Sequence, residues 1–207
     1  MLKIWGRPNS VNVQKVLWCL TELDVPYERV DAGLKYGKNN EPWYLALNPN
    51  GRVPLLQDGD FSLWESNTIV RYLASKHGLG TLCPKPLETR AHAERWMDWQ
   101  LSVLVNPVST VFWNLIRTPP TGPDRAAIET STKEANRACA ILDGHLQTNE
   151  FVAGPRFSMG DIPVGATVHR WLALRGVERP ALPALAAWHG RLSERLAFRT
   201  HVMLPLS

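Results

Sequence analysis

The sequence changes its pattern once, near residue 78, and this change constrains the fold more than any other feature. Before it, short apolar runs of strand length alternate with segments whose apolar residues recur every three or four positions. After it, only the helical spacing recurs. The 207 residues are enough for one large domain or two small ones. The pattern therefore predicts an α/β domain at 1–78, a linker at 79–86 and an all-helical domain at 87–207.

The first domain is predicted to have the order strand, helix, strand, loop, hairpin, helix. Apolar runs closed by Gly and Pro indicate the strands, and an Asp-Gly-Asp turn indicates the hairpin. The predicted segments are strand 2–5, helix 10–23, strand 27–30, the hairpin 54–57 with 61–63, and helix 65–76. This order is typical of a small sheet covered by helices.

The second domain shows helical spacing in three stretches, 97–108, 138–146 and 182–192. Residues 118–123, rich in Thr, Pro and Gly, are predicted to separate the first two helices. We identify no strand signal beyond residue 86.

Composition excludes several classes of function. The 23 Lys and Arg residues exceed the 19 Asp and Glu residues only slightly and form no run of five, so no nucleic-acid partner is expected. No stretch approaches the ~20 apolar residues that a membrane span needs. The three Cys and six His show no metal-ligand spacing, so neither a disulfide framework nor a metal site is expected. The opening residues, broken by Gly and Pro, do not resemble a signal peptide. We expect a cytoplasmic protein.

Three local sequences, in this order, resemble cytosolic glutathione transferases: WGRPNSVNVQKVLWCLTEL, then NPNGRVPLL with the hairpin and LWESNTIVRYLA, then FSMGDIPVGA. The resemblance covers nearly the whole chain and is nearest to the bacterial, serine-type, theta-like members. It implies a thioredoxin-like βαβ-ββα domain that binds glutathione as co-substrate. It also implies an all-helical domain that forms a hydrophobic substrate site, and a homodimer.

The resemblance places glutathione at Val53, Pro54, Glu65 and Ser66. In the family, a cis bond before the proline exposes the backbone of the preceding residue to the cysteinyl part of glutathione. A trans proline opening an edge strand is the alternative from the residues alone. Ser66 would hold the γ-glutamyl carboxylate at a helix N-terminus, with Glu65 facing the ammonium. An ordinary N-cap serine is the simpler alternative, and the two are compatible.

Ser10 is the candidate catalytic residue, with Asn12 as an accessory or rival donor. By resemblance, a hydroxyl in the turn after the first strand donates a hydrogen bond to the glutathione sulfur and stabilises the thiolate. The alternative is that Asn9 or Ser10 only caps the helix. The chain lacks the tyrosine and cysteine of other family variants at this place. Cys19, the nearest thiol, is expected in the core.

The second substrate is expected along the first long helix of the helical domain. Pro107, Trp113 and Arg117 are the candidates, with the alternative that such rings form the core between the domains. Arg52 and Arg7 are the candidates for contacting the glycine carboxylate of glutathione.

The sequence around 158–161 predicts a capping box, which is a folding element. The function predicted is attack by bound glutathione thiolate on a hydrophobic electrophile. A glutathione-dependent dehalogenase, isomerase or peroxidase and a non-catalytic binding protein are the alternatives. No motif identifies the electrophile.

Overall fold

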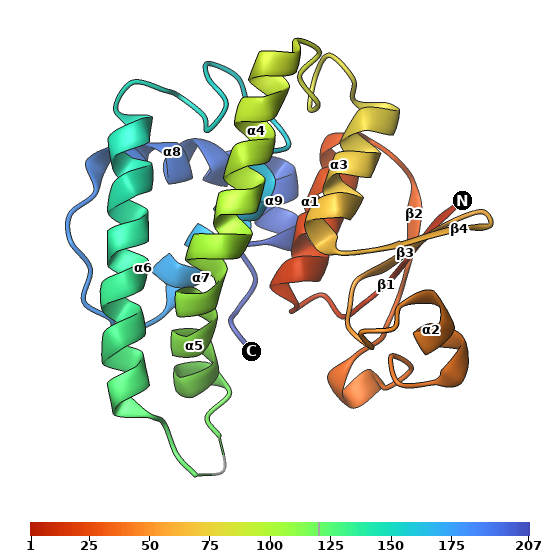
Figure 1. Ribbon diagram of the computed structural model, residues 1–207, viewed down its shortest axis with the longest axis horizontal. Coiled ribbons are helices and arrows are strands. Elements are labelled where there is room, and N and C mark those ends of the chain that lie inside the picture. The colour runs from red at the N-terminus through yellow and green to blue at the C-terminus, as the bar shows by residue number, and fades with distance from the viewer. Residues whose placement is uncertain (120) are drawn as a thin grey trace.

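The computed structural model describes residues 1–119 and 121–207. Pro120, within the stretch predicted to separate two helices, lies outside them. A four-stranded sheet with three helices forms one part of the molecule, and a group of helices lies beside it (Figure 1). The predicted fold class, thioredoxin-like followed by all-helical, is therefore confirmed.

The first part matches the predicted element order closely. Its elements are β1 (Leu2–Trp5), α1 (Val11–Glu22), β2 (Tyr27–Val30), the 3₁₀ turn η1 (Leu34–Tyr36), α2 (Pro42–Leu47), β3 (Leu55–Asp58), β4 (Phe61–Trp64) and α3 (Ser66–His77). The strand order is β2-β1-β3-β4. β2 runs parallel to β1, and β3 is antiparallel to both β1 and β4.

The two faces of the sheet are covered differently, because successive strand residues point to opposite sides. Ile4 of β1 and Leu56 of β3 enter the main core with residues of α1 and α3. Leu55, next to Leu56, packs with Tyr44 of α2 in a smaller core. α1 and α3 therefore cover one face, and α2 with its loops covers the other. The second face lies beside the cavity described below.

Among its described residues, the second part consists of helices and the loops between them, with no strand apart from an isolated bridge. Its helices are α4 (Leu87–Trp99), the π-helical turn η2 (Gln100–Leu104), α5 (Val105–Ile116), α6 (Arg125–Leu146), α7 (Asp161–Ala173), α8 (Pro183–Ser193) and α9 (Leu196–His201). The first long helix is thus α4 and α5 joined by a π turn. Pro107 is the third residue of α5, directly after the π turn.

The predicted capping box opens α7. The N–H of Ser158 donates to Asp161 Oδ2 at 2.9 Å, and the N–H of Gly160 donates to Ser158 Oγ at 3.3 Å. Asp161 Oδ1 also accepts from the N–H of Val152 and from Trp188 Nε1, both at 3.0 Å. The buried carboxylate therefore joins α7 to α8 as well as capping its own helix.

α1 joins the two parts into one body. Trp18, fully buried, packs edge-on against Phe198 of α9 and lies near Phe157. One continuous apolar core runs from the sheet through α1 into the helices. In the described part of the chain, no helix is both long enough and apolar enough to cross a bilayer.

Candidate active site

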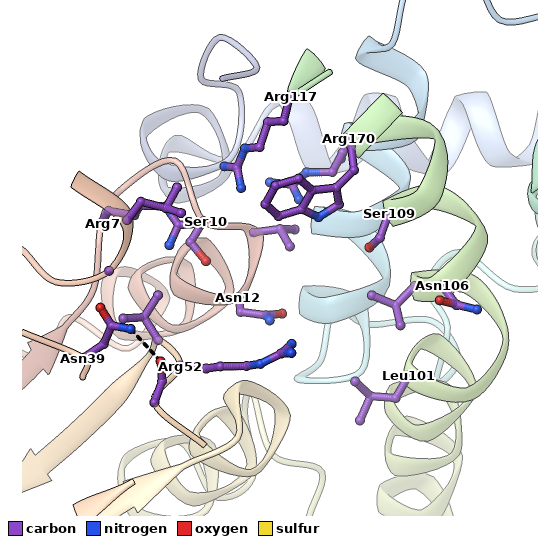
Figure 2. Close-up of a pocket in the computed structure, with 17 residues that line it drawn as sticks. Arg7, Ser10, Asn12, Asn39, Arg52, Leu101, Asn106, Ser109, Arg117 and Arg170 are labelled. Atoms are coloured by element: carbon purple, nitrogen blue, oxygen red, sulfur yellow. Dashed lines mark hydrogen bonds between the residues drawn. The ribbon is translucent and has the colours of Figure 1, made fainter. Parts of the chain in front are cut away.

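A cavity of about 560 Å³ lies between the loops of the sheet domain and helices α5 and α7 (Figure 2). Its lining combines polar, apolar and cationic residues from both parts of the molecule. The lining residues are Arg7, Ser10, Val11, Asn12, Gly33, Leu34, Asn39, Gly51, Arg52, Val53, Leu101, Val105, Asn106, Ser109, Trp113, Arg117 and Arg170.

Ser10 stands at the N-terminus of α1 and borders the cavity. Its main chain is extended, with φ −88° and ψ 120°, and its carbonyl accepts from the N–H of Gln14 at 2.8 Å. Its side chain makes no capping hydrogen bond to the helix. Ser10 is 8% exposed, and its hydroxyl is drawn toward the cavity in Figure 2. The geometry therefore does not support the alternative of a simple capping serine.

Asn12 lines the floor of the cavity, and hydrogen bonds from Lys15 and Ser66 orient its side chain. Its Oδ1 accepts from Lys15 Nζ at 3.0 Å and from Ser66 Oγ at 3.3 Å. When Lys15 is protonated, its ammonium group only donates, so the amide oxygen of Asn12 faces it. The amide N–H groups of Asn12 are then left for other acceptors.

Lys15 was not anticipated from the sequence, although it is the most unusual side chain near the cavity. It is fully buried, and Nζ also lies 3.2 Å from Asn67 Oδ1 and 3.4 Å from Gln100 Oε1. Burial, reinforced by Arg170 and opposed by Glu65, lowers the pKa of Lys15 to about 7. Its position four residues after Val11, on the apolar stripe of α1, was the available signal.

The predicted glutathione residues lie around the same end of α1. The Val53–Pro54 bond is cis. Val53 lines the cavity, and neither its N–H nor its carbonyl hydrogen-bonds within residues 1–119 and 121–207. Glu65, with φ +70°, precedes α3, and Ser66 is its buried first residue. Pro54, Glu65 and Ser66 do not line the cavity itself, but Ser66 contacts it through Asn12.

Only some of the residues predicted to bind the second substrate line the cavity. Trp113 and Arg117 line the cavity, and the guanidinium of Arg117 lies 4.6 Å from the Trp113 ring centroid. Pro107 is buried within the bundle and does not line the cavity, whereas its neighbour Asn106 does. Arg52 lines the cavity and, in Figure 2, reaches toward the helix that carries Leu101.

Arg170 of α7 is a second residue that sequence reasoning missed. It is 9% exposed, and its guanidinium lies 4.1 Å from the centroid of Phe112. Together with Arg7, Arg52 and Arg117 it brings four arginines to the cavity, whose lining contains no Asp or Glu. An arginine within the mostly apolar helix α7 was the signal that could have identified it.

The cavity lining contains no Cys, His, Asp or Glu among the described residues. Cys19 is buried on α1, away from the cavity lining, and burial raises its thiol pKa. Within the part of the chain that the structure describes, no three His, Cys, Asp or Glu side chains are placed to hold a metal ion.

Comparison with known proteins agrees with this geometry. Residues 1–75 match the family described as glutathione S-transferase, N-terminal domain, and residues 125–191 match glutathione S-transferase, C-terminal domain. The chain is 43% identical to glutathione S-transferase GstB of Escherichia coli (strain K12), over 209 aligned residues that cover 100% of both proteins. The chain belongs to the glutathione S-transferase family.

Further comparisons show which glutathione S-transferases the chain resembles. The chain is 32% identical to glutathione S-transferase 3 of Zea mays, covering 99% of this chain and 95% of the maize protein. It superimposes with a TM-score of 0.95 on the theta class glutathione S-transferase of Xanthomonas axonopodis pv. citri, crystallised with glutathione bound. That pair is 43% identical and covers 100% of this chain and 99% of the other. The resemblance to theta-like bacterial members is therefore confirmed.

Proposed function

We propose that this glutathione S-transferase binds glutathione in the cavity and uses the Ser10 hydroxyl to stabilise the glutathione thiolate for attack on an electrophile. The observation that carries the proposal is the Ser10 hydroxyl itself. It stands at the N-terminus of α1, borders the cavity and makes no capping hydrogen bond.

Binding of glutathione is supported by groups that match its parts. The N–H and carbonyl of Val53, a lining residue, have no partner among the described residues and are available to pair with the backbone of a peptide ligand. Ser66 offers a hydroxyl and an N–H at the N-terminus of α3, where a carboxylate is favoured. Glu65 carries the charge that suits an ammonium, and Arg52 suits the glycine carboxylate. The Xanthomonas relative binds glutathione.

In this binding mode the glutathione sulfur lies beside Ser10, which activates the thiol. A cysteine thiol has a pKa near ~8.5, so most of it is protonated at neutral pH. A hydroxyl that donates to the sulfur and a helix N-terminus both favour the thiolate. Asn12, whose oxygen is held by Lys15, turns its amide N–H groups toward other acceptors and is the accessory donor.

The electrophile binds on the α5 side of the cavity in this proposal. Leu101, Val105 and Trp113 supply apolar surface there, and Arg117 supplies a cation. The sulfur forms a bond to the electrophilic carbon, and the leaving group departs with its bonding electron pair. Holding both reactants together supplies much of the rate gain. A homodimer and a cytoplasmic location are the accompanying proposals, and both rest on the family.

The test is conjugation of 1-chloro-2,4-dinitrobenzene to glutathione, together with calorimetric binding of S-methylglutathione. We expect Ser10→Ala to lower kcat/KM by about 10- to 100-fold, the size of one hydrogen bond to a charged group, while binding S-methylglutathione nearly as well. Ser102→Ala is the matched control, because Ser102 Oγ donates to the main chain of its own helix at 2.9 Å. Full activity of Ser10→Ala would refute the proposal.

A further inference from the structure

Three of the four cavity arginines form a cluster at one end of the cavity. Arg7 comes from the loop between β1 and α1, Arg117 from the end of α5, and Arg170 from α7 (Figure 2). Arg117 lowers the pKa of both Arg7 and Arg170, and Arg7 also lowers that of Arg170, so the positive charges are near one another. Burial is the larger cause in each case.

The cluster has no anionic side chain to balance it among the described residues. None of the three arginines forms a salt bridge with a side chain of the described residues. The hydrogen bonds that Arg117 and Arg170 donate go to main-chain oxygens. Arg117 Nη2 donates to the oxygen of Ser207 at 2.9 Å, and Arg170 Nη2 to that of Asn9 at 3.5 Å. The Nε atoms of Arg7 and Arg170 are buried without a partner. The contact with Ser207 involves Arg117 alone. Arg7 and Arg170 pair with no anionic group of the described residues.

Aromatic rings, not carboxylates, lie against two members of the cluster, Arg117 and Arg170. The Phe112 ring lies 4.1 Å from the guanidinium of Arg170 and 5.0 Å from that of Arg117. Trp113 lies 4.6 Å from Arg117. Stacking uses the face of a guanidinium and leaves its N–H edges available. Guanidinium N–H groups that are already held in position and partly removed from water bind a carboxylate well.

We infer that the electrophile used by this enzyme carries a negatively charged oxyanion, most simply a carboxylate, on an apolar body, and that Arg7, Arg117 and Arg170 bind it. The inference rests on the proposed function and specifies its second substrate. Leu101, Val105 and Trp113 contact the apolar body beside the cluster. Arg52 is left for the glycine carboxylate of glutathione.

The cluster also answers an electrostatic problem of the reaction. A thiolate and an anionic electrophile repel each other, which slows their encounter. Three nearby cations offset that repulsion inside the cavity, where charges are screened less than in water. In a test reaction, the glutathione sulfur displaces chloride from an activated ring. The C–S bond forms, the C–Cl bond breaks, chloride leaves with the bonding pair, and the thiol proton goes to the buffer.

The probes are 4-chloro-3-nitrobenzoate and 4-chloro-3-nitrobenzamide, which differ in charge but hardly in shape. S-Methylglutathione, which cannot react, is first titrated into wild type and each variant. The benzoate and the benzamide are then titrated into the saturated protein. We expect wild type to bind the benzoate at least about tenfold more tightly than the benzamide. We expect Arg117→Gln or Arg7→Gln to remove most of that preference.

Arg125→Gln is the matched control, because Arg125 is exposed at the start of α6 and does not line the cavity, so the substitution removes the same charge without touching the lining. Turnover of both probes with glutathione should show the same preference in kcat/KM. Equal binding of benzoate and benzamide by wild type would overturn the inference. So would variants that lose S-methylglutathione instead of the benzoate, because the cluster would then belong to glutathione. If wild type does not bind S-methylglutathione, the proposed function itself fails, before any electrophile is added.

Discussion

Lys15 Nζ donates to Asn12 Oδ1 at 3.0 Å, one helical turn earlier on α1, although the lysine side chain is fully buried. This contact connects the floor of the cavity to the interior between the domains. From Lys15 the polar chain continues to Gln100, whose Nε2 donates to Thr167 Oγ1 of α7 at 2.9 Å. The orientation of Asn12 therefore depends on how α1, η2 and α7 pack together.

The buried lysine makes stability depend on pH. The pKa of Lys15 is about 7 in the folded protein, against 10.5 for an ordinary lysine. Between these values the unfolded chain binds more protons than the folded one, so the free energy of unfolding rises with pH. Relative to Lys15→Met, wild type should gain on the order of 1 kcal/mol per pH unit between about pH 7 and 9. Urea unfolding at several pH values measures this, with Lys85→Met as an exposed control. Equal slopes for wild type and Lys15→Met would contradict it.

Ser66 should contribute to the binding of glutathione and not to the lowering of its thiol pKa. Its hydroxyl and N–H lie at the N-terminus of α3, where we place the γ-glutamyl carboxylate. Ser66→Ala should weaken binding of S-methylglutathione by about tenfold, as loss of one hydrogen bond to a charged group predicts. The thiol pKa of bound glutathione should hardly change. Ser75→Ala, farther along the same helix, is the control. Unchanged affinity in Ser66→Ala would remove Ser66 from the site.

Asp161 should matter far more to stability than an ordinary cap. Asp161→Ala leaves the donors of Val152, Ser158 and Trp188 buried without an acceptor, so we expect a loss of about 3 kcal/mol or more. Among the described residues, Asp124, the exposed N-cap of α6, accepts only from the N–H of Ala127. Asp124→Ala should cost about 0.5–2 kcal/mol. Similar losses in urea unfolding would show that Asp161 acts as a cap alone.

Close packing of α7 against α1 should make Gly165 sensitive to a single methyl group. A Cβ there would lie 2.6 Å from Leu192 Cδ1 and 3.1 Å from the Trp18 ring. We expect Gly165→Ala to lower the free energy of unfolding by about 1–3 kcal/mol. Gly144 of α6 has nothing within 4 Å of its Cβ position, so Gly144→Ala should stabilise by about 0.5–1 kcal/mol. Thermal unfolding of both variants measures the contrast, and a stabilised Gly165→Ala would disprove the close contact.

Local patterns predicted the elements but not which groups meet across the domains. The strands and α1 were predictable because their apolar spacing is local. The burial of Lys15 was not, because helical periodicity does not show that Asn67 and Gln100 will supply oxygens from other elements. The arginine cluster was missed for the same reason, since its members come from distant parts of the sequence.

Pro107 shows a second limit. The sequence placed it on the helix beside the substrate but did not reveal the π turn at Gln100–Leu104. A π turn holds more residues than an α turn, so it changes which side of the following helix faces the cavity. Asn106 and Ser109 line the cavity instead, while Pro107 is buried.

The central claim is that Ser10 stabilises the thiolate of bound glutathione. The most direct measurement is the ultraviolet thiolate absorbance of glutathione bound to wild type and to Ser10→Ala, titrated against pH. We expect wild type to hold the thiol pKa clearly below the ~8.5 of a free thiol, and Ser10→Ala to return it toward that value. Bound glutathione with the same lowered pKa in both proteins would contradict the claim and make Asn12 the activating residue.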